Sequence, residues 1–161
     1  MPEISPLGWF HTGLGALAVI TGIVSLAKYK EITWQTQLGG FYLIATLVTA
    51  ASALGIYQQG GFGPGHILAV MTLLALAVGT VASMTDLFGK LSRYARALSF
   101  SATLFFHSIP AITDGLLRLP VGDPVLTSIT DPILGICYAI LLVTFLVGVT
   151  LQLRWIRRQQ A

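Results

Sequence analysis

Five long apolar runs dominate this chain and decide what it can fold into. A helix needs about 20 mostly apolar residues to cross the hydrocarbon core of a bilayer. The runs cover about residues 7–27, 39–57, 64–84, 97–117 and 132–153. Transmembrane β-strands alternate in segments of about 10 residues, whereas these runs are continuous and rich in Ala, Leu and Gly. The sequence therefore predicts an all-α integral membrane bundle of five transmembrane helices, with residues 1–161 forming one transmembrane domain.

The composition excludes most soluble classes of protein. Hydrophobic residues make up 55% of the chain and charged residues 9%, against roughly 25% charged residues in an ordinary soluble domain. These proportions argue against a water-soluble enzyme, a nucleic-acid-binding protein and a disordered protein. The single cysteine, Cys137, lies in an apolar run. It excludes an internal disulfide and a zinc site built from several thiolates.

Basic residues predict how the bundle is oriented. Eight of the nine Lys and Arg residues fall in the two connections and the tail that five spans would place on one side, namely Lys28, Lys30, Lys90, Arg93, Arg96, Arg154, Arg157 and Arg158. The opposite side receives Arg118 together with Glu3, Asp114, Asp123 and Asp131. By the positive-inside rule, the N-terminus faces outward and the C-terminus faces the cytoplasm. We therefore expect a multi-pass protein of a bacterial inner membrane whose partner is the lipid bilayer and not nucleic acid.

The three histidines of the chain, His11, His66 and His107, all fall within predicted spans. Ionisable residues at membrane depth are costly and usually face the interior of a bundle. At about 1.5 Å per residue, the three lie roughly 3–10 Å from the outer ends of their spans. They therefore share the outer leaflet on three different helices. A histidine near a span end can also be only an interfacial residue, and this alternative is strongest for His66.

Small and polar residues accompany the histidines. Helical spacing from His11 reaches Gly15, Ala18 and Gly22, and such a small-residue face admits another backbone or a flat cofactor. On the second run, Tyr42, Thr46, Thr49 and Ala53 form a small, partly polar stripe. That stripe is suited to hydrogen-bond imidazoles that bind a metal.

Two chemistries use histidines held in this way. The first is b-type haem bound axially by His11 and His107, with His66 nearby or in place of one of them. Such a protein would exchange electrons with a quinone or with a periplasmic or membrane redox partner. The second is a zinc or copper site formed by His11, His66 and His107, with water or Asp114 as a fourth ligand, for metal handling or metal-dependent hydrolysis. A third alternative is an accessory or assembly subunit without active chemistry.

Several short motifs resemble a known family. They are Trp9-Phe10-His11-Thr12-Gly13, then Leu38-Gly39-Gly40-Phe41-Tyr42, then Gly60-Gly61-Phe62-Gly63-Pro64-Gly65-His66. Together they resemble a bacterial "predicted membrane protein" family of unknown function, in which a histidine opens one span and a Gly-Phe-Gly-Pro-x-His turn opens another. The later segments His107-Ser108-Ile109-Pro110-Ala111 and Arg118-Leu119-Pro120 are similar to some members. The family name implies no activity.

One departure from that family concerns the inner side. Family members often carry His-Arg before the Leu-Gly-x-x-Tyr segment, where this chain has Gln35-Thr36-Gln37. No histidine site is therefore expected on the cytoplasmic side. The leading prediction is a small membrane redox protein that binds haem b near its outer face.

Overall fold

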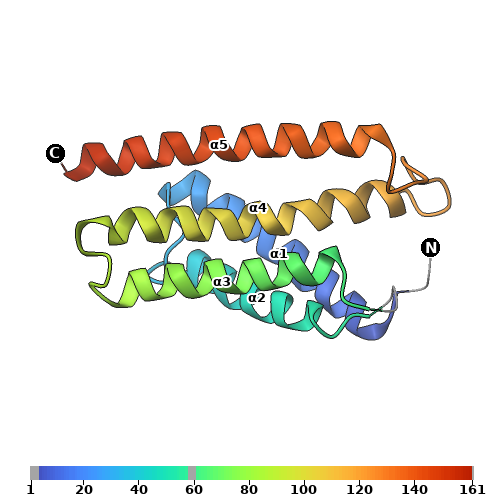
Figure 1. Cartoon of the computed structure of the whole chain (residues 1–161), viewed down its shortest axis with the longest axis horizontal. Coiled ribbons are helices and arrows are strands. Elements are labelled where there is room, and N and C mark those ends of the chain that lie inside the picture. Colours follow the sequence, from blue (N-terminus) through green and yellow to red (C-terminus); the bar gives the residue numbers. More distant parts are fainter. Residues whose placement is uncertain (1–3, 58–60, 161) are drawn as a thin grey trace.

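The computed structural model describes residues 4–57 and 61–160 of the chain. Five α-helices follow one another, and over this part of the chain there is no strand (Figure 1). They are α1 (Pro6–Tyr29), α2 (Gln37–Ala53), α3 (Pro64–Met84), α4 (Ser92–Arg118) and α5 (Pro132–Gln160), with a short 3-10 turn, η1 (Gly89–Leu91), before α4. The predicted all-α class is confirmed. Glu3, which is predicted on the outer side, and Gly60, the first residue of the glycine-rich motif before His66, lie outside the described residues.

Three of the helices, α1, α3 and α5, are long and apolar enough to cross a membrane. Helix α2 is apolar but has only 17 residues. Helix α4 carries Arg93, Arg96, His107, Asp114 and Arg118 and is the most polar of the five. The order and number of helices match the prediction, while the crossing of α2 and α4 and the sidedness of the bundle stay predictions.

The helix bounds show which ends hydropathy predicts correctly and which it does not. Helix α3 has the predicted bounds, and the side chain of Ser5 caps α1 by accepting a hydrogen bond from the Gly8 amide at 3.1 Å. Helix α2 stops at Ala53, four residues early, because the next three amides turn back to carbonyls only three residues away. Helices α4 and α5 extend well beyond their apolar runs, since helical backbone hydrogen bonds do not require apolar side chains.

The helices alternate in direction, which gives the bundle two distinct ends (Figure 1). The starts of α1 and α3 and the end of α4 meet at the histidine end, where their residues line one cavity. At the arginine end, Arg93 of α4 contacts Glu31 after α1, and Gln152 of α5 donates to the Lys30 carbonyl at 2.8 Å. The three basic regions of the sequence therefore share one end of the bundle, as the charge pattern predicts.

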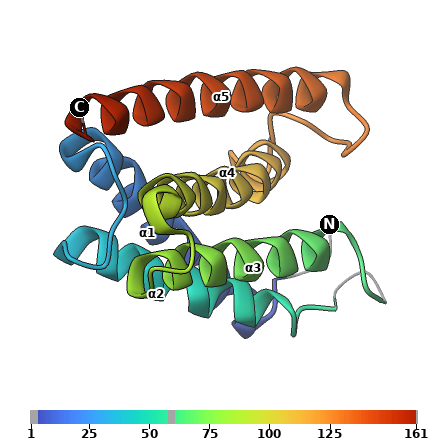
Figure 2. The same ribbon diagram turned by 60° about the vertical axis from the view of Figure 1, so that its left-hand side comes forward.

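Helix α4 occupies the middle of the bundle, which explains its polarity. It packs against α3, α5 and α1, and Figure 2 shows it between α5 and α3. Its polar residues Ser101, Thr103 and His107 are buried against these neighbours. Thr103 pairs with the hydroxyl of the fully buried Tyr42 at 2.6 Å. Polar side chains on such a helix can face protein rather than lipid.

The small-residue face of α1 is covered by α2. A Cβ placed on Gly22 would lie 2.8 Å from the ring of Tyr42, and one on Gly15 would lie 3.4 Å from the methyl group of Thr49. Ala18, between them, has no exposed surface. Of the two uses that the sequence allowed for this face, close approach of another helix is therefore the one found, and a flat cofactor cannot lie there.

Replacement of Gly22 by alanine is expected to destabilise the protein by about 1–3 kcal/mol, because the buried Tyr42 ring must move. The matched control is Gly13→Ala on the same helix, where an added Cβ meets nothing within 4 Å. That control is expected to be neutral or stabilising by up to about 1 kcal/mol through helix propensity. Thermal unfolding in detergent measures both. Equal effects of the two substitutions would contradict the close α1–α2 contact.

A buried carboxylate organises the arginine end. Glu31 is 5% exposed and bonds Arg93 at 2.5 Å and Arg96 at 2.9 Å. The guanidinium of Arg93 also lies over the ring of Trp155, 5.2 Å from its centre. These contacts join the α1–α2 connection to α4 and α5. In the sequence, Arg93 and Arg96 indicate only topology, and no local pattern points to Glu31 as their partner.

Candidate functional site

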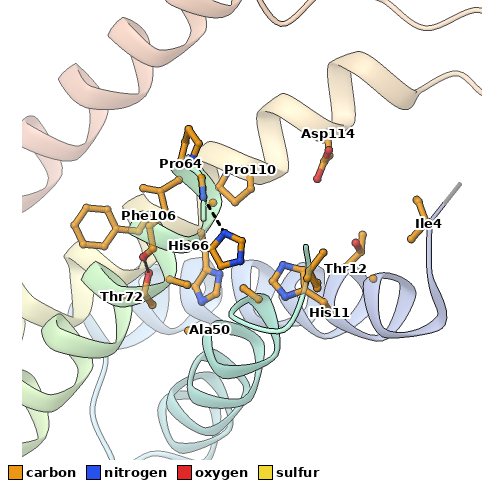
Figure 3. Close-up of a pocket in the computed structure, with 18 of the residues that line it drawn as sticks. Ile4, His11, Thr12, Ala50, Pro64, His66, Thr72, Phe106, Pro110 and Asp114 are labelled. Atoms are coloured by element: carbon orange, nitrogen blue, oxygen red, sulfur yellow. Dashed lines mark hydrogen bonds between the residues drawn. The ribbon is translucent and has the colours of Figure 1, made fainter. Parts of the chain in front are cut away.

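The three histidines line one cavity of about 300 Å³ at the histidine end. His11 comes from α1, His66 from the first turn of α3 and His107 from the second half of α4. Figure 3 shows the rings of His11 and His66 directed toward the space that they share, with Asp114 above them on α4. The cavity is partly open, and its volume lies at the lower end of the range for ligand pockets, about 300–1,000 Å³.

Contacts with α2 hold the His11 ring and place a proton on its Nδ1 atom. Its Nδ1 lies 3.0 Å from the Thr49 carbonyl oxygen and 3.2 Å from the Ser52 hydroxyl. A carbonyl oxygen only accepts hydrogen bonds, so Nδ1 carries the proton and donates it. The Nε2 atom of the neutral ring then has a free lone pair. Metal-binding histidines use the same arrangement, in which one ring nitrogen donates to a carbonyl and the other binds the metal.

His107 is 9% exposed and presents a ring nitrogen without a partner. Its Nε2 atom is buried, and no hydrogen-bonding group of residues 4–57 or 61–160 reaches it. Leaving a buried polar atom unpaired costs about 1–3 kcal/mol. A ligand that binds this nitrogen would remove that cost.

His66 has the opposite protonation pattern from His11. The Gly63 amide donates to its Nδ1 at 3.2 Å, so the proton of the neutral ring is on Nε2. This Nε2 atom is also buried and without a partner among the described residues. The ring centre lies 4.8 Å from that of Tyr57 and 5.0 Å from that of Phe62. His66 therefore offers the cavity a hydrogen-bond donor, while His11 offers a lone pair.

Asp114 and Arg118, two charged residues that line the cavity, form an ion pair with each other. Arg118 Nε lies 3.3 Å from Asp114 Oδ1, an ion pair of the kind that a spacing of four residues on one helix allows. Asp114 is about half exposed in this pair. Exposed pairs of this kind contribute about 0–1 kcal/mol to stability.

The four residues predicted for a zinc or copper site, His11, His66, His107 and Asp114, all line this cavity. Across the described part of the chain, no three His, Cys, Asp or Glu side chains are arranged to hold one ion. The proton on His66 Nε2 points to the same conclusion, because a metal needs that lone pair. Of the other two rings, His11 has its proton on Nδ1 and a lone pair on Nε2, and His107 Nε2 is buried without a partner among the described residues.

Sequence reasoning missed the groups that orient the imidazoles. It expected the hydroxyl stripe of α2 to do so, whereas the Thr49 backbone carbonyl and the Ser52 hydroxyl contact His11. The hydroxyls of Thr46 and Thr49 are buried without a partner among the described residues. The motif Gly-Pro-x-His did contain a signal for His66, since it places a glycine amide three residues before the ring.

Comparison with known proteins gave no match among protein-family models, curated proteins or solved structures. The resemblance to the bacterial "predicted membrane protein" family thus stays a prediction.

Proposed function

We propose that this chain is a small redox protein of a bacterial inner membrane, which binds one b-type haem through His11 and His107. The observation that carries the proposal is the pair of ring nitrogens at one cavity. His11 Nε2 is freed by the bond from Nδ1 to the Thr49 carbonyl, and His107 Nε2 is buried without a partner among the described residues. Two neutral imidazoles from different helices are the usual axial pair of a b-type haem in a helical bundle.

The size of the cavity limits how a haem would be held. A space of about 300 Å³ is too small to enclose the whole macrocycle. The proposal therefore requires that part of the ring extend through the open side of the cavity or that α1 and α4 separate slightly. Among the described residues, His66 Nε2–H and Arg118 are two of the groups at this end that could donate to the haem carboxylates. Haem iron supplies one-electron chemistry between its ferric and ferrous states.

The proposed orientation places the haem near the outer face. All five helices would cross the membrane, with the N-terminus outside and the C-terminus in the cytoplasm. The support is that eight of the nine Lys and Arg residues belong to regions at the arginine end, and basic residues favour the cytoplasmic side. A quinone or a periplasmic or membrane redox partner would then reach the haem from the outer leaflet.

Haem titration tests this function. We expect detergent-purified protein from haem-deficient cells to take up one equivalent of haemin, with a saturable Soret change and a higher melting temperature. The control is haemin in the same micelles without protein. Uptake that never saturates, or that leaves the melting temperature unchanged, would count against a specific site. It would favour the third expectation, an accessory subunit without a cofactor.

A further inference from the structure

A second cavity, larger than the first, lies between α1, α4 and α5. Its volume is about 670 Å³, and its walls are almost entirely apolar, with Leu26, Leu104, Phe145 and Gly148 among the lining residues. It forms because α5 packs along α4 and barely contacts α1. Figure 2 shows α5 on the outside of the bundle, against α4. We call this space the α5 groove.

The length of the α5 groove matches one leaflet of a bilayer. Its wall on α5 runs from Leu141 to Trp155, which is about 21 Å at 1.5 Å per residue. Half of a bilayer, headgroup region included, is about 20–22 Å thick. The groove therefore has the depth of one lipid, with Trp155 at the level where tryptophans usually meet headgroups.

The end of the groove at Trp155 is positively charged. Lys30 lines it, and Gln152 joins it to α5 by donating to the Lys30 carbonyl at 2.8 Å. Arg93 lies over the ring of Trp155, and it shares the Glu31 carboxylate with Arg96. These three charged side chains together have a net charge of one positive unit. The Nε atom of Arg96 is buried and has no partner within the described ranges. Elsewhere along the groove, the described lining residues include no ionised group.

We propose that the α5 groove binds one anionic glycerophospholipid, with an acyl chain along Leu104, Phe145 and Gly148 and its phosphate beside Lys30. Basic pockets between transmembrane helices on the cytoplasmic side are suited to anionic headgroups. Because α5 stands apart from α1, apolar side chains between them lack protein partners. An acyl chain in the groove would contact these side chains. The inference does not depend on haem.

Native mass spectrometry of the detergent-solubilised full chain, titrated with phosphatidylglycerol or phosphatidylcholine, tests the proposal. We expect one tightly bound phosphatidylglycerol per chain and weaker binding of phosphatidylcholine. Lys30→Gln should weaken phosphatidylglycerol binding about five-fold, the usual contribution of one basic residue near a lipid surface. Lys28→Gln is the matched control, because Lys28 lies over Tyr29 and outside the groove.

A second pair of variants tests the acyl-chain site without changing charge. Gly148→Phe adds a ring inside the groove, where an added Cβ meets nothing within 4 Å. Gly135→Phe, on the same helix, is equally uncrowded and lies outside the groove. Only Gly148→Phe should reduce the binding of both lipids. Equal binding of the two lipids by the unmodified protein, no effect of Gly148→Phe, or preferential uptake of ubiquinone would each overturn the proposal.

Discussion

Replacing Glu31 by glutamine is expected to lower the free energy of unfolding by about 2–4 kcal/mol, since removing one member of a buried ion pair leaves its partners uncompensated. Two arginines depend on this single carboxylate, at 2.5 and 2.9 Å. Their side chains are 27% and 20% exposed, so solvent reduces the loss below that of a fully buried pair. Thermal or denaturant unfolding in detergent measures the change.

The bundle contains its own control for this prediction. Asp114→Asn removes the carboxylate of the more exposed Asp114–Arg118 pair, and the expected loss is below about 1 kcal/mol. Because each substitution keeps the shape of the side chain, the difference between them isolates burial. Similar losses for both would show that Glu31 does not hold the arginine end together.

The second large effect is expected at the histidines. His11→Ala and His107→Ala should each weaken haem binding by roughly 100-fold or more, which exceeds the 10–100-fold usual for losing an outer partner of a ligand. His66→Ala should retain two axial ligands, because Gly63 donates to its Nδ1 and the proton occupies Nε2. Haem titration and the optical spectrum of each variant measure this contrast.

Two further measurements distinguish the loss of haem binding from a loss of folding. The helix content and melting temperature of each cofactor-free variant show whether it folds, and added imidazole should restore a low-spin spectrum to His11→Ala and His107→Ala. A folded His11→Ala variant that binds haem as tightly as the unmodified protein would exclude His11 as a ligand. Loss of an axial ligand in His66→Ala would exclude the proton assignment made for His66.

Features encoded locally could be predicted from the sequence. The bounds of α3 follow from Pro64 and an uninterrupted apolar run, and the shared location of the histidines follows from helices that alternate in direction. The Asp114–Arg118 pair follows from a spacing of one helical turn. In each case the interacting groups belong to one helix, or their relative positions are set by the topology alone.

The rest depends on contacts between distant parts of the chain. Glu31 and Arg93 are 62 residues apart, and Tyr42 and Thr103 are 61 residues apart. No local pattern shows that the Tyr42 ring occupies the space beside Gly22. Nor does one show that the Thr49 carbonyl fixes the position of the proton on His11. Hydropathy also underestimated the length of α4, because neighbouring helices cover its polar side chains.

The most direct test is an absorption spectrum of the protein purified in detergent from haem-replete cells, oxidised and then reduced with dithionite, with metal analysis of the same sample. The proposed function predicts about one haem iron per chain, a Soret band that shifts on reduction, and sharp α and β bands from two histidine ligands. A folded but colourless protein without iron would contradict the proposed function.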